Sequence, residues 1–255
     1  MRDGPVALKI GNEHVEGTLL TPDRLIPGIL FVHGWGGCQE HDLDVARAIA
    51  RLGCLCFTFD LRGHARSSRQ RRSVTREDNL ADLVAAYDFL AGQEAVDRQA
   101  IAVVGASYGA YLATILTTRR PVCWLGLRVP ALYRDDNWDV PKEDLDREDL
   151  DAYRRSYLGP GDNVALDACA KFGGDVLLVE SECDEVIPHP AIVSYLGAFR
   201  NVRSLTYRLM EGADHALTEP ACQKLYNAML TNWVTEMVLG AREGQQAGSF
   251  SPARP

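Results

Sequence analysis

The sequence predicts one α/β domain with a mostly parallel, doubly wound sheet, and three observations favour this fold class. Short apolar runs rich in β-branched residues, typical of strands buried on both faces, recur along the chain. Segments with helical spacing of apolar residues separate these runs, as in a sheet covered by helices on both faces. The 255 residues are enough for one such domain, and no change in composition marks a second. We place this domain in residues 1–240.

The elements follow from the periodicity of apolar residues and from the glycines and prolines between them. The expected strands are residues 5–10, 13–20, 28–32, 54–59, 101–104, 122–127, 175–180 and 204–209. The expected helices are about residues 43–52, 75–93, 110–116, 190–199 and 219–239. The first two strands flank Gly11-Asn12, a strong hairpin signal, so we expect an antiparallel hairpin at the N-terminal edge of the sheet.

Two segments depart from the alternation of strand and helix. Residues 128–165 are acidic, aromatic and interrupted by prolines and glycines, so we expect an insertion there and no strand. Residues 241–255 are rich in Gly, Gln, Ser and Pro. This composition predicts an unstructured tail.

A serine between two glycines lies at the centre of the predicted site. The run Gly105-Ala106-Ser107-Tyr108-Gly109 follows an apolar strand and precedes a helix. A G-x-S-x-G turn in this setting needs small residues beside the serine, because a Cβ at either glycine would crowd the neighbouring strand and helix. The bend would expose the Ser107 hydroxyl at a helix N-terminus, where the helix dipole favours an oxyanion. We predict that Ser107 is a nucleophile, the alternative being a structural glycine-rich turn.

A serine nucleophile needs a base that takes its proton and a carboxylate that orients the base. Asp184 and His215 each follow a predicted strand. They therefore lie at the carboxyl edge, where an open α/β sheet builds its site. Their order in the chain after Ser107 is the one expected for such a site.

Other residues could fill the same roles. Glu182 or Glu185 could replace Asp184, and His64 is an alternative base, although we expect its loop to hydrogen-bond the backbone near the serine turn. We interpret Asp214 as facing away from the site or capping the last helix. The remaining histidines, interpreted as structural or exposed, are His14, His33, His41 and His189.

An oxyanion hole requires two backbone N–H donors. One is the amide that follows the nucleophile, which belongs to Tyr108, and the other comes from a loop after an earlier strand. Glycines in the loop His33-Gly34-Trp35-Gly36-Gly37 allow an amide to turn inward, so we choose Trp35 as the second donor.

Charge and composition exclude several kinds of partner. The net charge is −8 and no basic stripe is present, which argues against a nucleic-acid partner. Residues 1–5 lead into no apolar segment typical of a secretion signal, and no run approaches the roughly 20 apolar residues of a membrane span. The seven cysteines have no repeated spacing, which favours reduced thiols over disulfides or a zinc site. We therefore expect a cytoplasmic protein that uses no membrane and no metal.

These motifs together resemble the α/β-hydrolase superfamily over residues 28–239. The serine turn, the acid, the histidine and the His33-Gly34-Trp35 loop match its active-site motifs. The superfamily's D-x-R-G-H-G-x-S loop matches residues 60–67, with Ala65 in place of the usual glycine, a departure that concerns local backbone geometry. The insertion at residues 128–165 is similar in placement and size to the small lids of bacterial carboxylesterases, including cinnamoyl and feruloyl esterases.

The resemblance implies the α/β-hydrolase fold and ester hydrolysis through an acyl-enzyme, without cofactors. Ser107 would attack the carbonyl, His215 would transfer the proton and Asp184 would hold the imidazole. The amides of Trp35 and Tyr108 would bind the oxyanion. The expected partner is a small-molecule ester, and a homodimer is compatible with the chain.

The expected acyl group depends on the lid. The aromatic residues of the lid would form an apolar wall for a small or aromatic acyl group, or they merely pack the lid onto the body of the protein; they are Tyr133, Trp138, Tyr153 and Tyr157. Thioesterase or small-substrate peptidase chemistry on the same residues is the alternative. A non-catalytic ligand-binding protein on the hydrolase fold is a further one.

Overall fold

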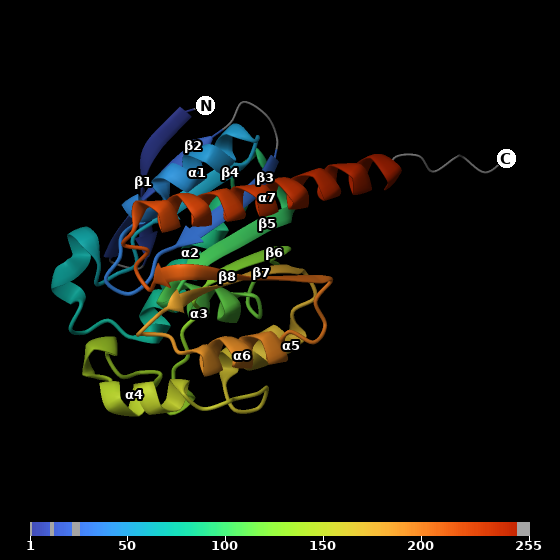
Figure 1. The fold of residues 1–255 in the computed structure, drawn as a ribbon. Coiled ribbons are helices and arrows are strands. Elements are labelled where there is room, and N and C mark those ends of the chain that lie inside the picture. Colours follow the sequence, from blue (N-terminus) through green and yellow to red (C-terminus); the bar gives the residue numbers. More distant parts are fainter. Residues whose placement is uncertain (1, 11–12, 22–25, 249–255) are drawn as a thin grey trace.

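One sheet organises the described part of the chain. The computed structural model describes residues 2–10, 13–21 and 26–248, and for residues 2, 3, 21 and 241–248 it describes the backbone only. The strands are β1 (Arg2–Ile10), β2 (Glu13–Thr21), β3 (Ile26–Val32), β4 (Leu55–Phe59), β5 (Val96–Ala106), β6 (Trp124–Arg128), β7 (Asp175–Cys183) and β8 (Ser204–Asp214). Their order is β1-β2-β4-β3-β5-β6-β7-β8 (Figure 1). The pairs β1–β2 and β2–β4 are antiparallel and the other pairs of neighbours are parallel, so the sheet is mostly parallel, as predicted.

Helices cover both faces of the sheet. They are α1 (Leu43–Arg51), α2 (Arg76–Ala91), α3 (Tyr108–Leu116), α4 (Arg147–Arg154), α5 (Val164–Lys171), α6 (His189–Ala198) and α7 (Pro220–Gly248). Helices α1 and α7 lie on one face, and α2, α3, α5 and α6 lie on the other (Figure 1). Helix α4 lies below this second layer in the same view, away from the sheet.

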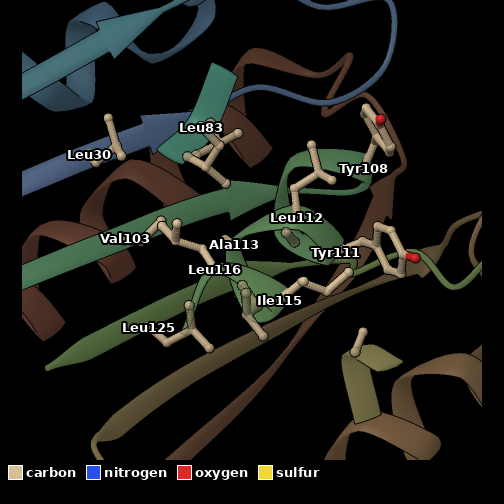
Figure 2. Close-up of a cluster of buried hydrophobic side chains, with 14 of the residues drawn as sticks. Leu30, Leu83, Val103, Tyr108, Tyr111, Leu112, Ala113, Ile115, Leu116 and Leu125 are labelled. Atoms are coloured by element: carbon tan, nitrogen blue, oxygen red, sulfur yellow. The ribbon is translucent and has the colours of Figure 1, made fainter. Parts of the chain in front are cut away.

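The sheet separates two apolar cores, because successive side chains of a strand point to opposite faces. Leu30 and Val103 belong to the core beneath α3, whereas Phe31 and Val104 belong to the core beneath α1 and α7. Figure 2 shows the first core, where Leu112 and its neighbours in α3 pack against strand residues. Strands β3 and β4 are buried along their whole length, so their continuous apolar runs reflect burial on both faces.

The predicted N-terminal hairpin is confirmed in its strands. Strands β1 and β2 pair antiparallel with Ile10 opposite Glu13. The Gly11-Asn12 turn itself lies outside the described residues.

The sequence pattern did not predict α4 or α5, which lie in and just after the insertion. Both helices begin at a side-chain cap: Asp146 accepts hydrogen bonds from the amides of Glu148 and Asp149, and Asn163 accepts one from the amide of Ala165. Such caps stabilise a short helix whose apolar periodicity is too brief to be recognised.

Helix α7 is longer than predicted. It continues to Gly248, so the expectation of an unstructured tail from residue 241 is wrong for residues 241–248, while 249–255 lie outside the described residues. Six of the eight residues in 241–248 are Ala, Arg, Glu or Gln, which propagate a helix well, and the other two are glycines. No helix in the described ranges is both long and apolar enough for a bilayer span.

A polar network fixes residues 60–67 to α2. Asp82 is fully buried and accepts hydrogen bonds from the backbone and the side chain of Arg62. Asn79 donates to the carbonyl of Arg62 and accepts from the Tyr108 hydroxyl, at 3.0 and 3.1 Å. The loop is therefore connected through α2 to the serine turn.

Ala65 in this loop has a φ of 44°. This is the left-handed region, which costs a non-glycine residue roughly 1–2 kcal/mol. The superfamily's glycine at this position is thus explained by backbone conformation, and the alanine of this chain is strained.

We expect Ala65→Gly to stabilise the protein. Relief of the strain should exceed the extra chain entropy of glycine, giving about 0.5–1 kcal/mol and a rise in Tm of about 2–3 °C in thermal denaturation. The matched control is Ala152→Gly on the exposed side of α4, which should lower stability because glycine is a poor helix former. A lower Tm for Ala65→Gly would contradict the strain argument.

Candidate active site

Ser107 lies at a sharp turn between β5 and α3, as the sequence predicts. Its φ and ψ are 52° and −111°, a conformation that non-glycine residues rarely adopt. A Cβ at Gly109 would lie 2.1 Å from the Val32 carbonyl oxygen, and one at Gly105 would lie 2.6 Å from the Ala110 backbone. Only glycine fits at these two positions, so they allow the strained serine to stand between strand and helix.

Asp184 and His215 are in direct contact. Asp184 lies in the loop after β7 and His215 in the loop after β8. The Nδ1 atom of His215 lies 2.7 Å from Oδ2 of Asp184. The other carboxylate oxygen accepts hydrogen bonds from the amides of Val186 and Ile187, both at 2.8 Å. The Asp184 side chain is 2% exposed and that of His215 is 25% exposed. A buried carboxylate held in this way fixes the orientation of an imidazole that still reaches solvent.

Ser107 and His215 line one pocket of about 520 Å³. Its walls come from the loop after β3, the start of α1, the serine turn, the end of β6, the loop after β8, and α7. Among the described hydrogen bonds none joins the Ser107 hydroxyl directly to His215. Such bonds are often long before a substrate binds, so the shared pocket is the relevant geometry.

The two predicted oxyanion donors flank the serine. Tyr108 is the first residue of α3, and Trp35 lies in the loop after β3 and lines the pocket. Within the described residues, no hydrogen bond uses the amide of Trp35 or Tyr108 as donor. An N–H group without a protein acceptor at a helix N-terminus suits a developing negative charge.

Arg128 is a site residue that the sequence analysis did not identify. Its carbonyl accepts a hydrogen bond from the Ser107 amide at 2.8 Å, and its Nη1 donates to the His215 carbonyl at 2.8 Å. A charged residue that ends a buried strand next to the serine turn was the available signal. Arg128 connects the backbone of the nucleophile to that of the histidine.

The pocket also has a polar side that the sequence did not reveal. Asp42 and Tyr226 line it together with Arg128. Burial raises the pKa of the Asp42 carboxyl to about 7, and the charge of Arg128 partly opposes this shift. Asp42 precedes α1 and Tyr226 lies in α7, so only tertiary structure brings them together.

Tyr133 and Trp138, the predicted substrate contacts, do not line this pocket. Tyr133 is 2% exposed and its ring packs edge-on against those of Tyr108 and Tyr111. Trp138 is half-buried and donates its indole N–H to Glu77. The prediction of an aromatic wall is corrected accordingly: both side chains pack the insertion onto the body of the protein.

The alternative acids have other surroundings. Glu182 accepts a hydrogen bond from the amide of Gly212, and Glu185 is exposed. Asp214 accepts hydrogen bonds from the amide and hydroxyl of Thr218, in the turn that precedes α7, so these bonds stabilise that turn and not the first turn of the helix. Asp184 is thus the carboxylate in contact with His215.

The alternative histidines also differ from the expected base. His14 and His41 are exposed, and His189 contacts Glu180 at 2.8 Å. The Nδ1 atom of His64 lies 3.1 Å from the Arg62 carbonyl oxygen, so its contact is with the backbone of its own loop and not, as expected, with the backbone near the serine turn. The described residues contain no group of His, Cys, Asp or Glu side chains arranged to hold a metal ion.

Two buried histidines support the loop of Trp35. Nε2 of His33 accepts a hydrogen bond from the Leu61 amide at 3.1 Å. The ring of His64 packs edge-on against those of Trp35 and His33, with centroids 4.7 and 4.9 Å apart. Burial lowers the pKa of both imidazoles to about 4. Both rings are therefore neutral in the folded protein at pH 7.

We predict that these histidines destabilise the protein in acid. In the unfolded chain these imidazoles bind protons near pH 6.5, whereas in the folded protein they bind them only near pH 4. The free energy of unfolding therefore has its full value above pH 6.5 and decreases as the pH falls towards 4. Between pH 7 and pH 5, His64→Gln should lose roughly 1–2 kcal/mol less unfolding free energy than the parent. Urea denaturation at both pH values measures this difference.

His14→Gln is the matched control for this measurement, because His14 is exposed at the edge of the sheet. It should show the same loss between the two pH values as the parent protein. Equal losses in His64→Gln and the parent would contradict the prediction.

Known proteins resemble this chain in sequence over part of its length. Residues 27–137 match the family model described as alpha/beta hydrolase fold. An uncharacterized protein of Mycobacterium tuberculosis, found in two strains, is 29% identical over 164 residues, which are 64% of this chain and 54% of the relative. The chain thus spans about half the length of the curated relatives it matches.

Solved structures of similar fold align with nearly the whole chain. Est1E from Butyrivibrio proteoclasticus with bound ferulic acid has a TM-score of 0.69 and 16% identity, covering 92% of this chain and 99% of that one. Dienelactone hydrolase from Anabaena variabilis has a TM-score of 0.67 and 18% identity, and the alignment covers 92% of this chain and 97% of that one. The esterase domain of a Rhodothermus marinus protein has a TM-score of 0.66 and 17% identity, and the alignment covers 92% of this chain and 99% of that one. The chain has the α/β-hydrolase fold, as its motifs predicted.

Proposed function

We propose that this chain, which has the α/β-hydrolase fold, is a serine hydrolase that cleaves carboxylic esters through an acyl-enzyme. The observation that carries the proposal is the 2.7 Å contact between Asp184 and His215 at the pocket that Ser107 lines. A strained serine, an oriented imidazole and a buried carboxylate are the three groups that this chemistry requires.

In this mechanism His215 takes the proton of the Ser107 hydroxyl as its oxygen attacks the ester carbonyl carbon. The amides of Trp35 and Tyr108 donate to the oxyanion of the tetrahedral intermediate. Asp184 stabilises the imidazolium, which then protonates the departing alcohol. Water, activated by the same imidazole, attacks the acyl-enzyme, and the carboxylic acid leaves.

The polar pocket supports esters with small acyl groups. Tyr133 and Trp138 were the residues expected to contact an aromatic acyl group, and neither lines the pocket. We therefore favour a small acyl group. We also propose a cytoplasmic location, which is supported by the seven cysteines, because their spacing favours reduced thiols over a disulfide framework.

Ser107→Ala should abolish reaction with a fluorophosphonate label and lower kcat/KM for p-nitrophenyl butyrate at least about 1,000-fold, because the nucleophile is lost. Ser156→Ala, at an exposed serine just after α4, is the matched control and should leave both unchanged. Labelling is followed by intact mass and hydrolysis by absorbance, with p-nitrophenyl acetate and octanoate and methyl ferulate as further esters.

The outcomes of this assay distinguish the alternatives. Labelling at Ser107 without hydrolysis of any ester would redirect the proposal to thioesters or peptides on the same residues. Absence of labelling in the parent protein would contradict a serine hydrolase and leave ligand binding as the function.

A further inference from the structure

The pocket contains a second set of polar groups apart from the proposed catalytic ones. We call Asp42, Arg128 and Tyr226 the polar subsite. Asp42 ends the 3-10 helix Gln39–Asp42, Arg128 ends β6, and Tyr226 lies in α7. All three line the same pocket as Ser107, and the Arg128 guanidinium lies 5.6 Å from the centroid of the Tyr226 ring. Three distant segments thus bring polar side chains to one side of the pocket.

The polar subsite has hydrogen-bonding capacity that the protein leaves unused. No described residue hydrogen-bonds the Asp42 carboxylate or the Tyr226 hydroxyl, although Tyr226 is only 9% exposed. The hydrogen bond of the Arg128 guanidinium within the described residues goes to the His215 carbonyl, and no described carboxylate lies within 4.0 Å of it. These side chains line the pocket with hydrogen-bonding positions that no described protein group fills, so they suit a ligand that supplies the partners.

The charges around the subsite select the chemistry of that ligand. Arg128 carries one positive charge, and the acidic residues Glu40 and Asp42 line the same pocket, where the nearby Asp44 is paired with Arg47. The acidic side chains offset the charge of Arg128, so the pocket does not favour an anionic ligand. The guanidinium and the phenol donate hydrogen bonds and the carboxylate accepts them. A neutral group that both donates and accepts meets all of these conditions, and a hydroxyl is the simplest such group.

We infer that the polar subsite binds a hydroxyl-bearing part of the substrate, so that hydroxylated esters are preferred to alkyl esters of the same shape. This inference rests on the proposed function for the identity of the bond that is cleaved. An alkyl chain in the same place would leave the guanidinium, the carboxylate and the phenol without partners, which is how sites built for hydroxyls reject apolar analogues.

Two matched pairs of esters test the preference on either side of the ester bond. The first pair is 2,3-dihydroxypropyl butyrate and propyl butyrate, and the second is ethyl 3-hydroxybutyrate and ethyl 3-methylbutyrate. Binding to the Ser107→Ala protein is measured by calorimetry, and kcat/KM is measured with the parent. In at least one pair we expect the hydroxylated ester to bind and to react at least about tenfold better.

Variants then assign the preference to the subsite. Tyr226→Phe and Asp42→Asn should each reduce the ratio between the two esters at least threefold. The matched control is Tyr157→Phe, because this tyrosine is 72% exposed and lies outside the pocket, and its ratio should stay that of the parent.

The binding and kinetic measurements separate the two proposals. Ratios near one in both pairs, or parental ratios in both subsite variants, would overturn the polar subsite. A clear preference in calorimetry, with no hydrolysis of any ester by the parent, would support the subsite and overturn the esterase proposal.

Discussion

The close contact between the start of α3 and the end of β3 is the constraint on which the rest of the site depends. Gly109 leaves no room for a side chain beside the carbonyls of Val32 and His33. This approach brings the loop that begins at His33 next to the turn that carries Ser107. The proposed nucleophile and both proposed oxyanion donors therefore share one place because two backbones touch there.

Arg128 extends this arrangement to the histidine. Its carbonyl accepts a hydrogen bond from the Ser107 amide and its guanidinium donates one to the His215 carbonyl, so one residue connects the loops that follow β5 and β8. Next to it, Val129 has a φ of 41°, and near His215, Leu217 has a φ of 52°. Strained residues persist where the surrounding structure fixes them, and here they gather at the carboxyl edge of the sheet around the pocket.

The insertion fills space beside the serine turn. The ring of Tyr133 packs against Tyr108, and the charged groups of Lys142 and Arg154 lie 5.3 and 4.9 Å from its centroid. Lys142 also lies 4.1 Å from the ring centroid of Trp35. Cations over aromatic faces hold the insertion onto the elements that carry the proposed oxyanion donors. The pocket lies on the side of the serine turn away from the insertion, where α1 and α7 supply polar walls.

The sequence by itself determined the fold class, the strands and the position of Ser107, because strand periodicity and the two glycines of the turn are local properties. It also identified Asp184 and His215 as candidates, since loops after parallel strands meet at one edge of the sheet, and the structure brings these two side chains into contact. Only the tertiary structure decided which side chains line the pocket. Tyr133 turned into the core, and Asp42 and Tyr226 came together from opposite ends of the chain, because packing between distant helices sets the direction of each side chain.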